Sequence, residues 1–239
     1  MNFSKITTKT ARLALLSALT VMAIVSVSQH AAAQLVIDNF SSGFYSKSLS
    51  TGSAYDTQTG TMAGGSRTVY LGVCEPTNPC DGNPFEQPNS YQIKKATKTT
   101  PNILIFNTGY DSDANLQIAY GDSGTMLLDL SPYDRIRLYF NGADQVVNFN
   151  LAVYYDGTYS SIGCNITNPG EPDAAFTVDL PFANFSGGDD FSDVNLMGFA
   201  FGVSQGTGTG VDWGITSIQA VNGVTGNPVI CGSSGSVTK

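Results

Sequence analysis

The strongest constraint on the fold is a period of two in the hydrophobic pattern. Apolar residues alternate with polar ones along most of the sequence, and no stretch after residue 33 keeps a 3.6-residue period for three turns. In residues 135–141, for example, Ile136, Leu138 and Phe140 alternate with polar or amphipathic side chains. This alternation is typical of strands with one buried face. We therefore predict an all-β chain.

The alternation predicts about ten short strands separated by clusters of Gly, Asn, Asp, Ser and Pro. A chain of this length can form one all-β domain, and we find no linker or repeat that would divide it. The simplest architecture is a single jelly-roll β-sandwich of antiparallel strands over residues 34–222. We expect strands at residues 35–40, 67–73, 102–108, 116–120, 126–130, 135–141, 146–155, 158–166, 175–180, 196–203 and 211–221.

The first 33 residues have the composition of a cleaved secretory signal peptide. Three basic residues, Lys5, Lys9 and Arg12, precede a mostly apolar stretch at 13–27, which is too short to cross a bilayer. Residues 31–33, all alanine, form a small-residue cleavage site. We therefore expect a secreted protein, extracellular or periplasmic, that does not insert into a membrane.

Removal of this segment changes the charge and eliminates one kind of chemistry. The remaining chain has 8 basic and 19 acidic residues, a formal net charge of −11, and it has lost His30, the only histidine. Without imidazole, Ser-His-Asp or Cys-His catalysis and His-ligated zinc are excluded. The negative charge and the lack of a basic run argue against nucleic acid as a partner. A neutral or cationic partner, or a divalent cation, is easier to accommodate.

The four cysteines of an exported chain predict two disulfides. Three pairings are possible, and we favour Cys74–Cys80 together with Cys164–Cys231. The first would close a short turn that contains two prolines, and the second would pin the C-terminal tail, residues 223–239, to the sheet. A metal site is disfavoured because the cysteines lack the paired spacing of Cys-x-x-Cys ligands.

One hairpin can be placed in register from the sequence. Asp156-Gly157 is a strong two-residue turn signal, and it sets Tyr154 opposite Tyr159. Tyrosine can lie under the apolar face of a sugar, and nearby polar groups can bind the hydroxyls. The alternative is a tyrosine pair that only stabilises the sheet, by about 0.2–1 kcal/mol. The predicted binding face consists of Tyr154, Tyr159, Asn148, Asn150 and Arg137.

Residues 196–203 combine bulky and very small side chains. Gly198, Ala200 and Gly202 alternate with large apolar residues, so one face of this strand is nearly bare. The bare face could be kept clear for a ligand, or it could allow close approach of a loop or neighbouring element, and we favour the second interpretation. Trp213, the only tryptophan, is interpreted as a core residue.

Two loops have the oxygen ligands that calcium prefers. Asp111, Asp113, Asn115 and Asp122 have a spacing close to that of an EF-hand loop, but Leu116 stands where that loop needs glycine. We therefore predict a looser structural calcium site at these four residues. A second candidate is the loop at 187–190 together with Asp193, and the alternative for both is a solvated acidic loop.

Several segments together resemble the galactose-binding-like β-sandwiches of secreted bacterial proteins and carbohydrate-binding modules. The resemblance lies in residues 36–40 (VIDNF), 64–67 (GGSR), 128–134 (LDLSPYD) and 212–218 (DWGITSI). It implies a jelly-roll sandwich that often binds sugars and sometimes carries a structural calcium ion. None of these segments is a catalytic motif.

The acidic residues do not favour an enzyme. Glycosidases need two carboxyl groups in a rigid cleft, but the three glutamates, Glu75, Glu86 and Glu171, lie in proline-rich loops. Asp129, Asp179 and Asp212, close to strands, remain as candidates. The sequence thus predicts a non-catalytic protein that binds carbohydrates or cell-surface polymers. The alternatives are a structural extracellular matrix or surface protein that binds protein partners, and a carbohydrate-active hydrolase or lyase.

Overall fold

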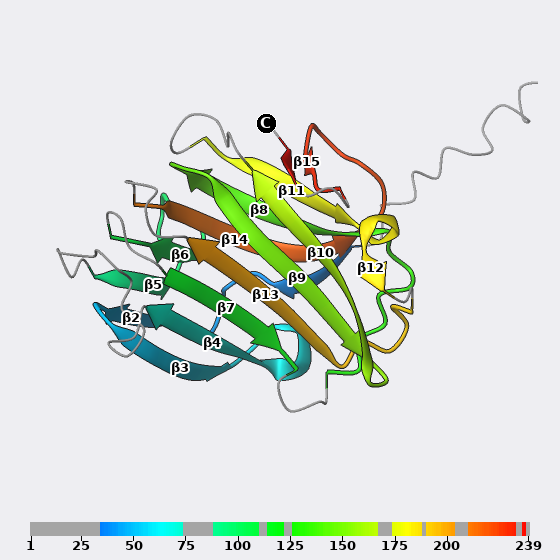
Figure 1. Cartoon of the computed structure of the whole chain (residues 1–239), viewed down its shortest axis with the longest axis horizontal. Helices are drawn as coiled ribbons and strands as arrows, with labels where there is room; N and C mark the ends of the chain where they lie inside the picture. Colours follow the sequence, from blue (N-terminus) through cyan, green and yellow to red (C-terminus); the bar gives the residue numbers. More distant parts are fainter. Residues whose placement is uncertain are drawn as a thin grey trace, which may run out of the picture. The chain divides into compact units, whose positions relative to one another are not determined.

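Strands make up most of the residues described by the structure, which is a computed structural model (Figure 1). It describes residues 34–73, 88–109, 114–121, 126–166, 174–187, 190–203, 210–232 and 236–237. All of these residues lie in one compact unit, Ala33–Lys239. The only helical elements described are two 3₁₀ turns, η1 (Ala63–Gly65) and η2 (Phe182–Asn184). The prediction of an all-β chain is therefore confirmed.

The strands form two sheets, which we call sheet A and sheet B. Sheet A runs in the order β15 (Val229–Ile230), β11 (Phe176–Pro181), β8 (Arg135–Ala143), β14 (Asp212–Val221), β6 (Ile103–Asn107), β5 (Asn89–Lys94) and β2 (Tyr45–Leu49), with β1 (Gln34–Asp38) also beside β14. Sheet B runs in the order β12 (Ser186–Gly187), β10 (Thr158–Ile166), β9 (Val147–Tyr155), β13 (Leu196–Val203), β7 (Ala114–Tyr120), β4 (Ser66–Val73) and β3 (Gly52–Thr59), with β16 (Ser236–Val237) beside β10.

The two sheets pack face to face and bury the apolar sides of their strands (Figure 1). In β9, for example, Phe149, Leu151 and Val153 are buried while the residues between them face outward. Trp213 is buried and packs against Phe201 of the opposite sheet, with tilted rings whose centroids are 4.5 Å apart. The interpretation of Trp213 as a core residue is therefore confirmed, and the chain forms a β-sandwich.

The predicted hairpin register is also confirmed. Tyr154 pairs with Tyr159 across the β9–β10 turn. Asp156 and Gly157 both have positive φ, +40° and +75°, as the tight turn between twisted strands requires. Because side chains alternate along a strand, this register sets which residues of both strands face outward.

The strand prediction differs from the structure in two ways. It omits β2, β3 and β5 and the two-residue strands β12, β15 and β16, which are polar or short and have no long apolar pattern. It also places a strand at 126–130, where the structure has only one isolated bridge, from Leu128 to Val194. Leu127 has a φ of +40°, which interrupts the extended conformation, so the segment forms a loop instead.

The tail after β14 joins the two sheets at one side of the sandwich. Its strands β15 and β16 pair in parallel with β11 of sheet A and with β10 of sheet B. The disulfide Cys164–Cys231 links β10 to the tail between these two strands, so this predicted pairing is confirmed. The predicted partners Cys74 and Cys80 lie outside the described residues.

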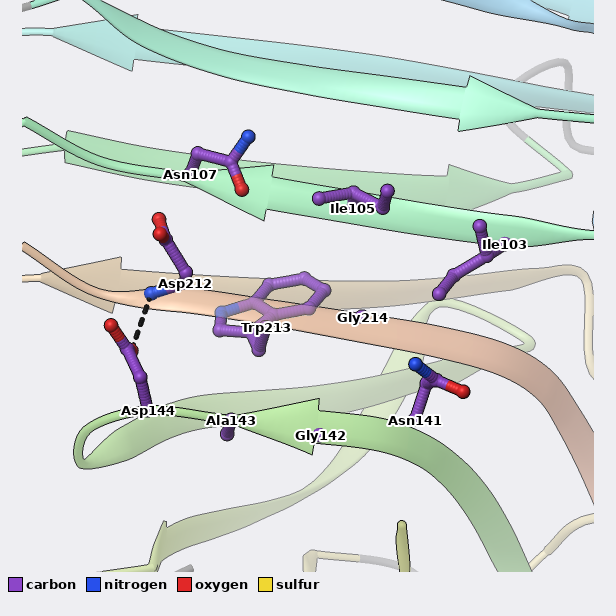
Figure 2. A pocket seen from close by; sticks show the side chains of 10 residues that line it. All are labelled: Ile103, Ile105, Asn107, Asn141, Gly142, Ala143, Asp144, Asp212, Trp213 and Gly214. Atoms are coloured by element: carbon purple, nitrogen blue, oxygen red, sulfur yellow. Dashed lines mark hydrogen bonds between the residues drawn. The ribbon is translucent and has the colours of Figure 1, made fainter. Parts of the chain in front are cut away.

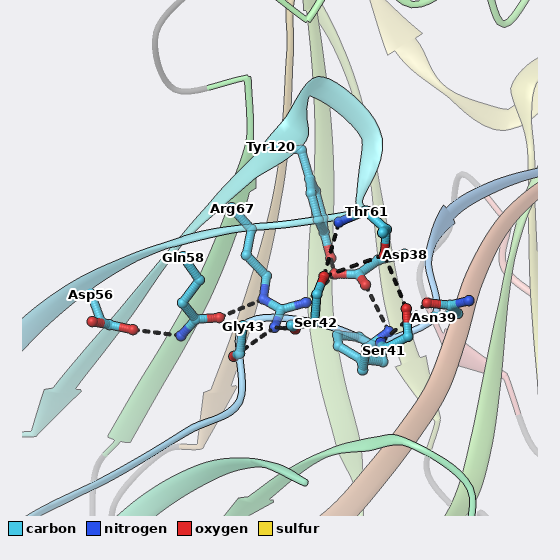
Figure 3. A network of polar contacts seen from close by, with 11 residues as sticks. Asp38, Asn39, Ser41, Ser42, Gly43, Asp56, Gln58, Thr61, Arg67 and Tyr120 are labelled. Atoms are coloured by element: carbon cyan, nitrogen blue, oxygen red, sulfur yellow. Dashed lines mark hydrogen bonds and ion pairs between the residues drawn. The ribbon is translucent and has the colours of Figure 1, made fainter. Parts of the chain in front are cut away.

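A buried ion pair connects the sheets on the inside (Figure 3). Asp38 of β1 accepts a hydrogen bond from Arg67 of β4 at 2.6 Å, and both side chains are almost fully buried. Tyr120 of β7 donates to the same carboxylate at 3.0 Å, and Gln58 accepts from Arg67 at 2.6 Å. The guanidinium also donates to two backbone carbonyls, those of Ser42 and Gly43, which satisfies most of its donors.

The described part of the chain contains no helix of the length and apolarity that a membrane span requires.

Candidate functional site

The outward surface of sheet B carries no charged side chain on the described parts of its six long strands. The pairing registers place its side chains in rows that cross β10, β9, β13, β7, β4 and β3. All are tyrosines, amides, hydroxyl residues or small residues, apart from one leucine. They are Tyr159, Ser161, Gly163, Asn165, Asn148, Asn150, Ala152, Tyr154, Leu196, Gly198, Ala200, Gly202, Asn115, Gln117, Ala119, Ser66, Thr68, Tyr70, Gly72, Ser53, Tyr55, Thr57 and Thr59.

The centre of this face is a shallow groove along β13, which we call the β13 groove. Its floor consists of Gly198, Ala200 and Gly202. A Cβ atom added at Gly198 or Gly202 would meet no described atom within 4 Å. No described loop or neighbouring element therefore approaches these glycines, and the interpretation that we favoured from the sequence is wrong.

Amide side chains flank the floor on both sides. Asn150 and Asn148 of β9 pair with Ala200 and Gly202, and Gln117 and Asn115 of β7 pair with the same two residues from the other side. These wall strands are two strand spacings apart, or about 10 Å. The groove thus has amide residues on both sides and nearly bare backbone between them. The Asn150 side chain leans toward β10, since a Cβ added at Gly163 would come within 2.9 Å of its oxygen.

A hollow of about 390 Å³ lies on the β9 side of the groove, across the outer faces of β10, β9 and β13. Its outward-facing lining residues are Asn148, Asn150, Asn165, Gly163, Ala200 and Gly202. The side-chain oxygens of Asn165 and Asn115 are buried and have no hydrogen-bond partner within the described chain. A buried polar atom without a partner loses its hydration without compensation, so each oxygen would gain a hydrogen bond only if its side chain turned outward toward a bound molecule.

Two tyrosine pairs stand on the same face. Tyr154 and Tyr159 are 38% and 56% exposed, and their ring centroids are 5.4 Å apart. Sequence reasoning placed Tyr154, Tyr159, Asn148 and Asn150 together, and the structure brings these four residues to one face.

The second pair, Tyr55 and Tyr70, has ring centroids 4.6 Å apart, and Tyr55 is 74% exposed. The ring of Tyr70 lies over Gly72, where an added Cβ would come within 2.7 Å of the tyrosine hydroxyl. Sequence reasoning missed this pair because it predicted no strand at 52–59. The alternation of Tyr55 with Ala54 and Asp56 was the available signal.

Arg137 does not belong to this face. It lies in β8 of sheet A, where it is buried and donates two hydrogen bonds to the Asp179 carboxylate, the shorter at 2.5 Å. These hydrogen bonds raise the pKa of the Arg137 guanidinium. The placement of Arg137 with the tyrosines was wrong because alternation gives the face of a strand but not the sheet to which it belongs.

The predicted calcium sites are only partly described. Asn115 lies on the outer face of β7, whereas Asp111, Asp113 and Asp122 are outside the described residues. In the second loop, Asp190 accepts hydrogen bonds from the backbone and hydroxyl of Ser192, which lower the pKa of its carboxyl group. Among the described residues, no group of three or more His, Cys, Asp or Glu side chains could hold a metal ion.

A second hollow, of about 280 Å³, lies on the outer face of sheet A across β6, β14 and β8 (Figure 2). Ile103, Ile105 and Gly214 contribute apolar surface, and two carboxylates stand at one end. The backbone N–H of Asp212 donates to Asp144 at 2.7 Å. Partial burial, and next the nearby charge of Asp144, raise the pKa of the Asp212 carboxyl group.

The remaining candidate aspartates have partners. Asp179 is fully buried between Arg137 and Arg135, so its carboxylate is not accessible for proton transfer. Asp129 accepts hydrogen bonds from the backbone and hydroxyl of Ser131, which is a local turn interaction. Of the three aspartates proposed from the sequence, Asp212 is the one that lines either of these two hollows in the described part of the chain.

Comparison with known proteins finds solved structures of similar architecture. No family model matches the sequence, and no curated protein matches it. A family 11 carbohydrate-binding module from Clostridium thermocellum, solved in complex with a β-1,3-1,4-mixed-linked tetrasaccharide, is 12% identical, with 81% of this chain and 98% of that chain covered and a TM-score of 0.41. The family 11 module of a cellulosomal cellulase from the same organism is 13% identical, with 82% and 98% covered and a TM-score of 0.42.

An exo-β-agarase is 12% identical, with 57% of this chain and 22% of that chain covered and a TM-score of 0.35. The alignments with the two family 11 carbohydrate-binding modules cover most of this chain. With TM-scores below 0.5, these similarities do not assign the chain to a family.

Proposed function

We propose that this protein is a secreted, non-catalytic carbohydrate-binding protein that uses the outer face of sheet B. One observation carries the proposal: an exposed tyrosine pair, Tyr154 and Tyr159, stands on the same uncharged face as the asparagine-lined hollow. Aromatic rings bind the apolar C–H face of a sugar, and placed polar groups orient its hydroxyls. Along β9, Tyr154 lies four residues from Asn150, a span of about 13 Å, so a ligand of several sugar units would contact both kinds of group.

The amides suit this role because each offers both a donor and an acceptor. A sugar hydroxyl also donates and accepts, so an Asn side chain can satisfy it whichever way its hydrogen points. The enclosed, unpartnered oxygens of Asn165 and Asn115 would gain a hydrogen bond if their side chains turned outward on binding. Tyrosines that only stabilise the sheet would not require such amides beside them.

The test is a glycan array with the wild-type protein and a Tyr154→Ala/Tyr159→Ala variant. We expect the wild type to bind glycans and the double variant to lose at least tenfold in affinity. Tyr45→Ala is the matched control, since Tyr45 is 38% exposed in sheet A and packs against Tyr91 with ring centroids 5.9 Å apart. If no glycan binds, or if the double variant binds as the wild type does, this face is not the site.

The carbohydrate-active enzyme remains a second candidate because of the hollow on sheet A. A carboxyl group with a raised pKa beside a second carboxylate is the pattern of a glycosidase acid and base pair. Release of reducing ends from polysaccharides that disappears in Asp212→Asn would support an enzyme. Equal release by Asp212→Asn and wild type would exclude this hollow as its active site.

A further inference from the structure

We propose that the β13 groove holds several units of a neutral, unbranched polysaccharide, with the chain running parallel to β13. This inference rests on the proposed carbohydrate binding and adds the position, direction and chemical class of the ligand. Figure 1 shows β13 in the interior of sheet B, between β9 and β7. A strand of eight residues is about 26 Å long, enough for several sugar units.

The charge of the face argues for a neutral ligand. The chain has 11 basic and 19 acidic residues, yet no described strand of sheet B directs one of them outward from β10 to β3. An acidic or basic sugar would lose hydration in the groove without gaining an opposite charge, which is unfavourable. A neutral sugar loses only hydroxyl hydration, which the amides replace.

The floor of the groove argues for a bound chain along β13. Glycine in the interior of a strand makes the folded protein less stable than a residue with a side chain would, because glycine loses more backbone entropy on folding and buries less surface. Gly198 and Gly202 have free space above them, so packing within the described chain does not require glycine at either position. A ligand that lies on the backbone of β13 does require it.

The two walls argue against a branched ligand. Asn148 stands at one edge and Gln117 at the other, with the wall strands about 10 Å apart. Asn150 leans toward Gly163 of β10, and the side-chain oxygen of Asn115 is enclosed. An unsubstituted chain can hydrogen-bond to both walls at once. A sugar branch at either edge would displace a wall amide from the main chain of the ligand and would leave that amide without a hydrogen-bond partner.

The first experiment fills the groove without disturbing the core. Gly202→Val is expected to keep or raise the melting temperature, because no described atom opposes the new side chain and valine favours strands. Ala200→Val is a second variant at the groove floor. Ser53→Val is the matched control, since Ser53 lies in the same row of the same face but on β3, at the edge of the sheet. Binding is measured by calorimetry with the hexasaccharides of cellulose, mannan and laminarin, and with a mixed-linkage β-glucan tetrasaccharide.

We expect at least one of these neutral linear probes to bind, and both groove variants to weaken it at least tenfold, with Ser53→Val unchanged. A xyloglucan oligosaccharide, an oligogalacturonate and a chitosan oligosaccharide should each bind at least tenfold more weakly than the best linear probe. Normal binding by Gly202→Val together with lost binding by Tyr154→Ala/Tyr159→Ala would overturn this inference and leave the proposed function intact. Stronger binding of a branched or charged probe would also overturn it. Binding by none of the probes would overturn this inference, and the glycan array would then decide whether the proposed function stands.

Discussion

The buried ion pair between Asp38 and Arg67 gives a quantitative prediction about how the two sheets are held together. In Asp38→Asn the new side chain has nearly the same size and can still accept the hydrogen bond that Phe40 N–H now donates at 2.7 Å. The other carboxylate oxygen, which accepts from Arg67 and Tyr120, becomes an NH₂ donor, so the substitution removes both the negative charge and that acceptor. Arg67 then keeps neutral acceptors, among them Gln58, but loses its one ion-pair partner among the described residues.

The expected cost is large because Arg67 is fully buried. Removal of one partner of a buried ion pair destabilises a protein by about 3–5 kcal/mol. A typical domain has a free energy of unfolding of about 5–15 kcal/mol, so this variant would lose a substantial share of its stability. For a domain of this size, the change corresponds to a decrease in melting temperature of roughly 6–20 °C.

The assay is urea unfolding with the disulfide intact, followed by the fluorescence of the buried Trp213. Arg67→Met and the double variant Asp38→Asn/Arg67→Met complete a double-mutant cycle. The double variant should be more stable than the sum of the single effects predicts, by about 2 kcal/mol, because neither charge is left alone. A cost below about 1 kcal/mol for Asp38→Asn, or additive single effects, would show that the ion pair does not hold the sheets together.

Three further predictions concern other groups of the fold. Because the pKa of Asp212 is raised, its contribution to stability is fully present below the ordinary aspartate pKa and is lost as the pH rises through the folded value. The charge of Asp144 is one cause of this shift, so Asp144→Asn should raise the melting temperature at pH 7 but not at pH 3. A lower melting temperature of the variant at pH 7 would contradict this. Burial and the Asp38 carboxylate raise the pKa of Tyr120 well above 10.0, so in an alkaline absorbance titration it should ionise only with unfolding, and ionisation of every tyrosine near pH 10 would refute this. The disulfide closes a loop with a sequence separation of 67, so Cys164→Ala/Cys231→Ala should lower the free energy of unfolding by about 4 kcal/mol. An unchanged urea midpoint would mean that the disulfide does not restrain the unfolded chain.

The sequence predicts features that depend on local chemistry. The Asp156-Gly157 turn sets the register of a hairpin, so the shared face of Tyr154 and Tyr159 follows from a few adjacent residues. The strands β2 and β3 were missed because edge strands are polar on both sides and need no apolar pattern. Because β3 was not predicted, Tyr55 could not be assigned to the candidate site from the sequence.

Features that depend on distant parts of the chain were not predictable. Arg137 has the same alternation as Tyr154, but its strand pairs into the other sheet, and only the tertiary fold shows this. Likewise, the alternation of Gly198 and Gly202 is the same whether a loop covers them or solvent does. Their exposure depends on the whole face of sheet B.

The linkage of the tail to β10 has a mechanical consequence. A pulling force on the chain beyond Cys231 would first load the short parallel contact between β16 and β10, and then the covalent bond to Cys164. The force would thus enter sheet B through β10 and would not pull β14 away from its neighbours in sheet A. If the protein is tethered through this end, the sandwich should extend by only the few residues after Cys231 before the sheets themselves have to break.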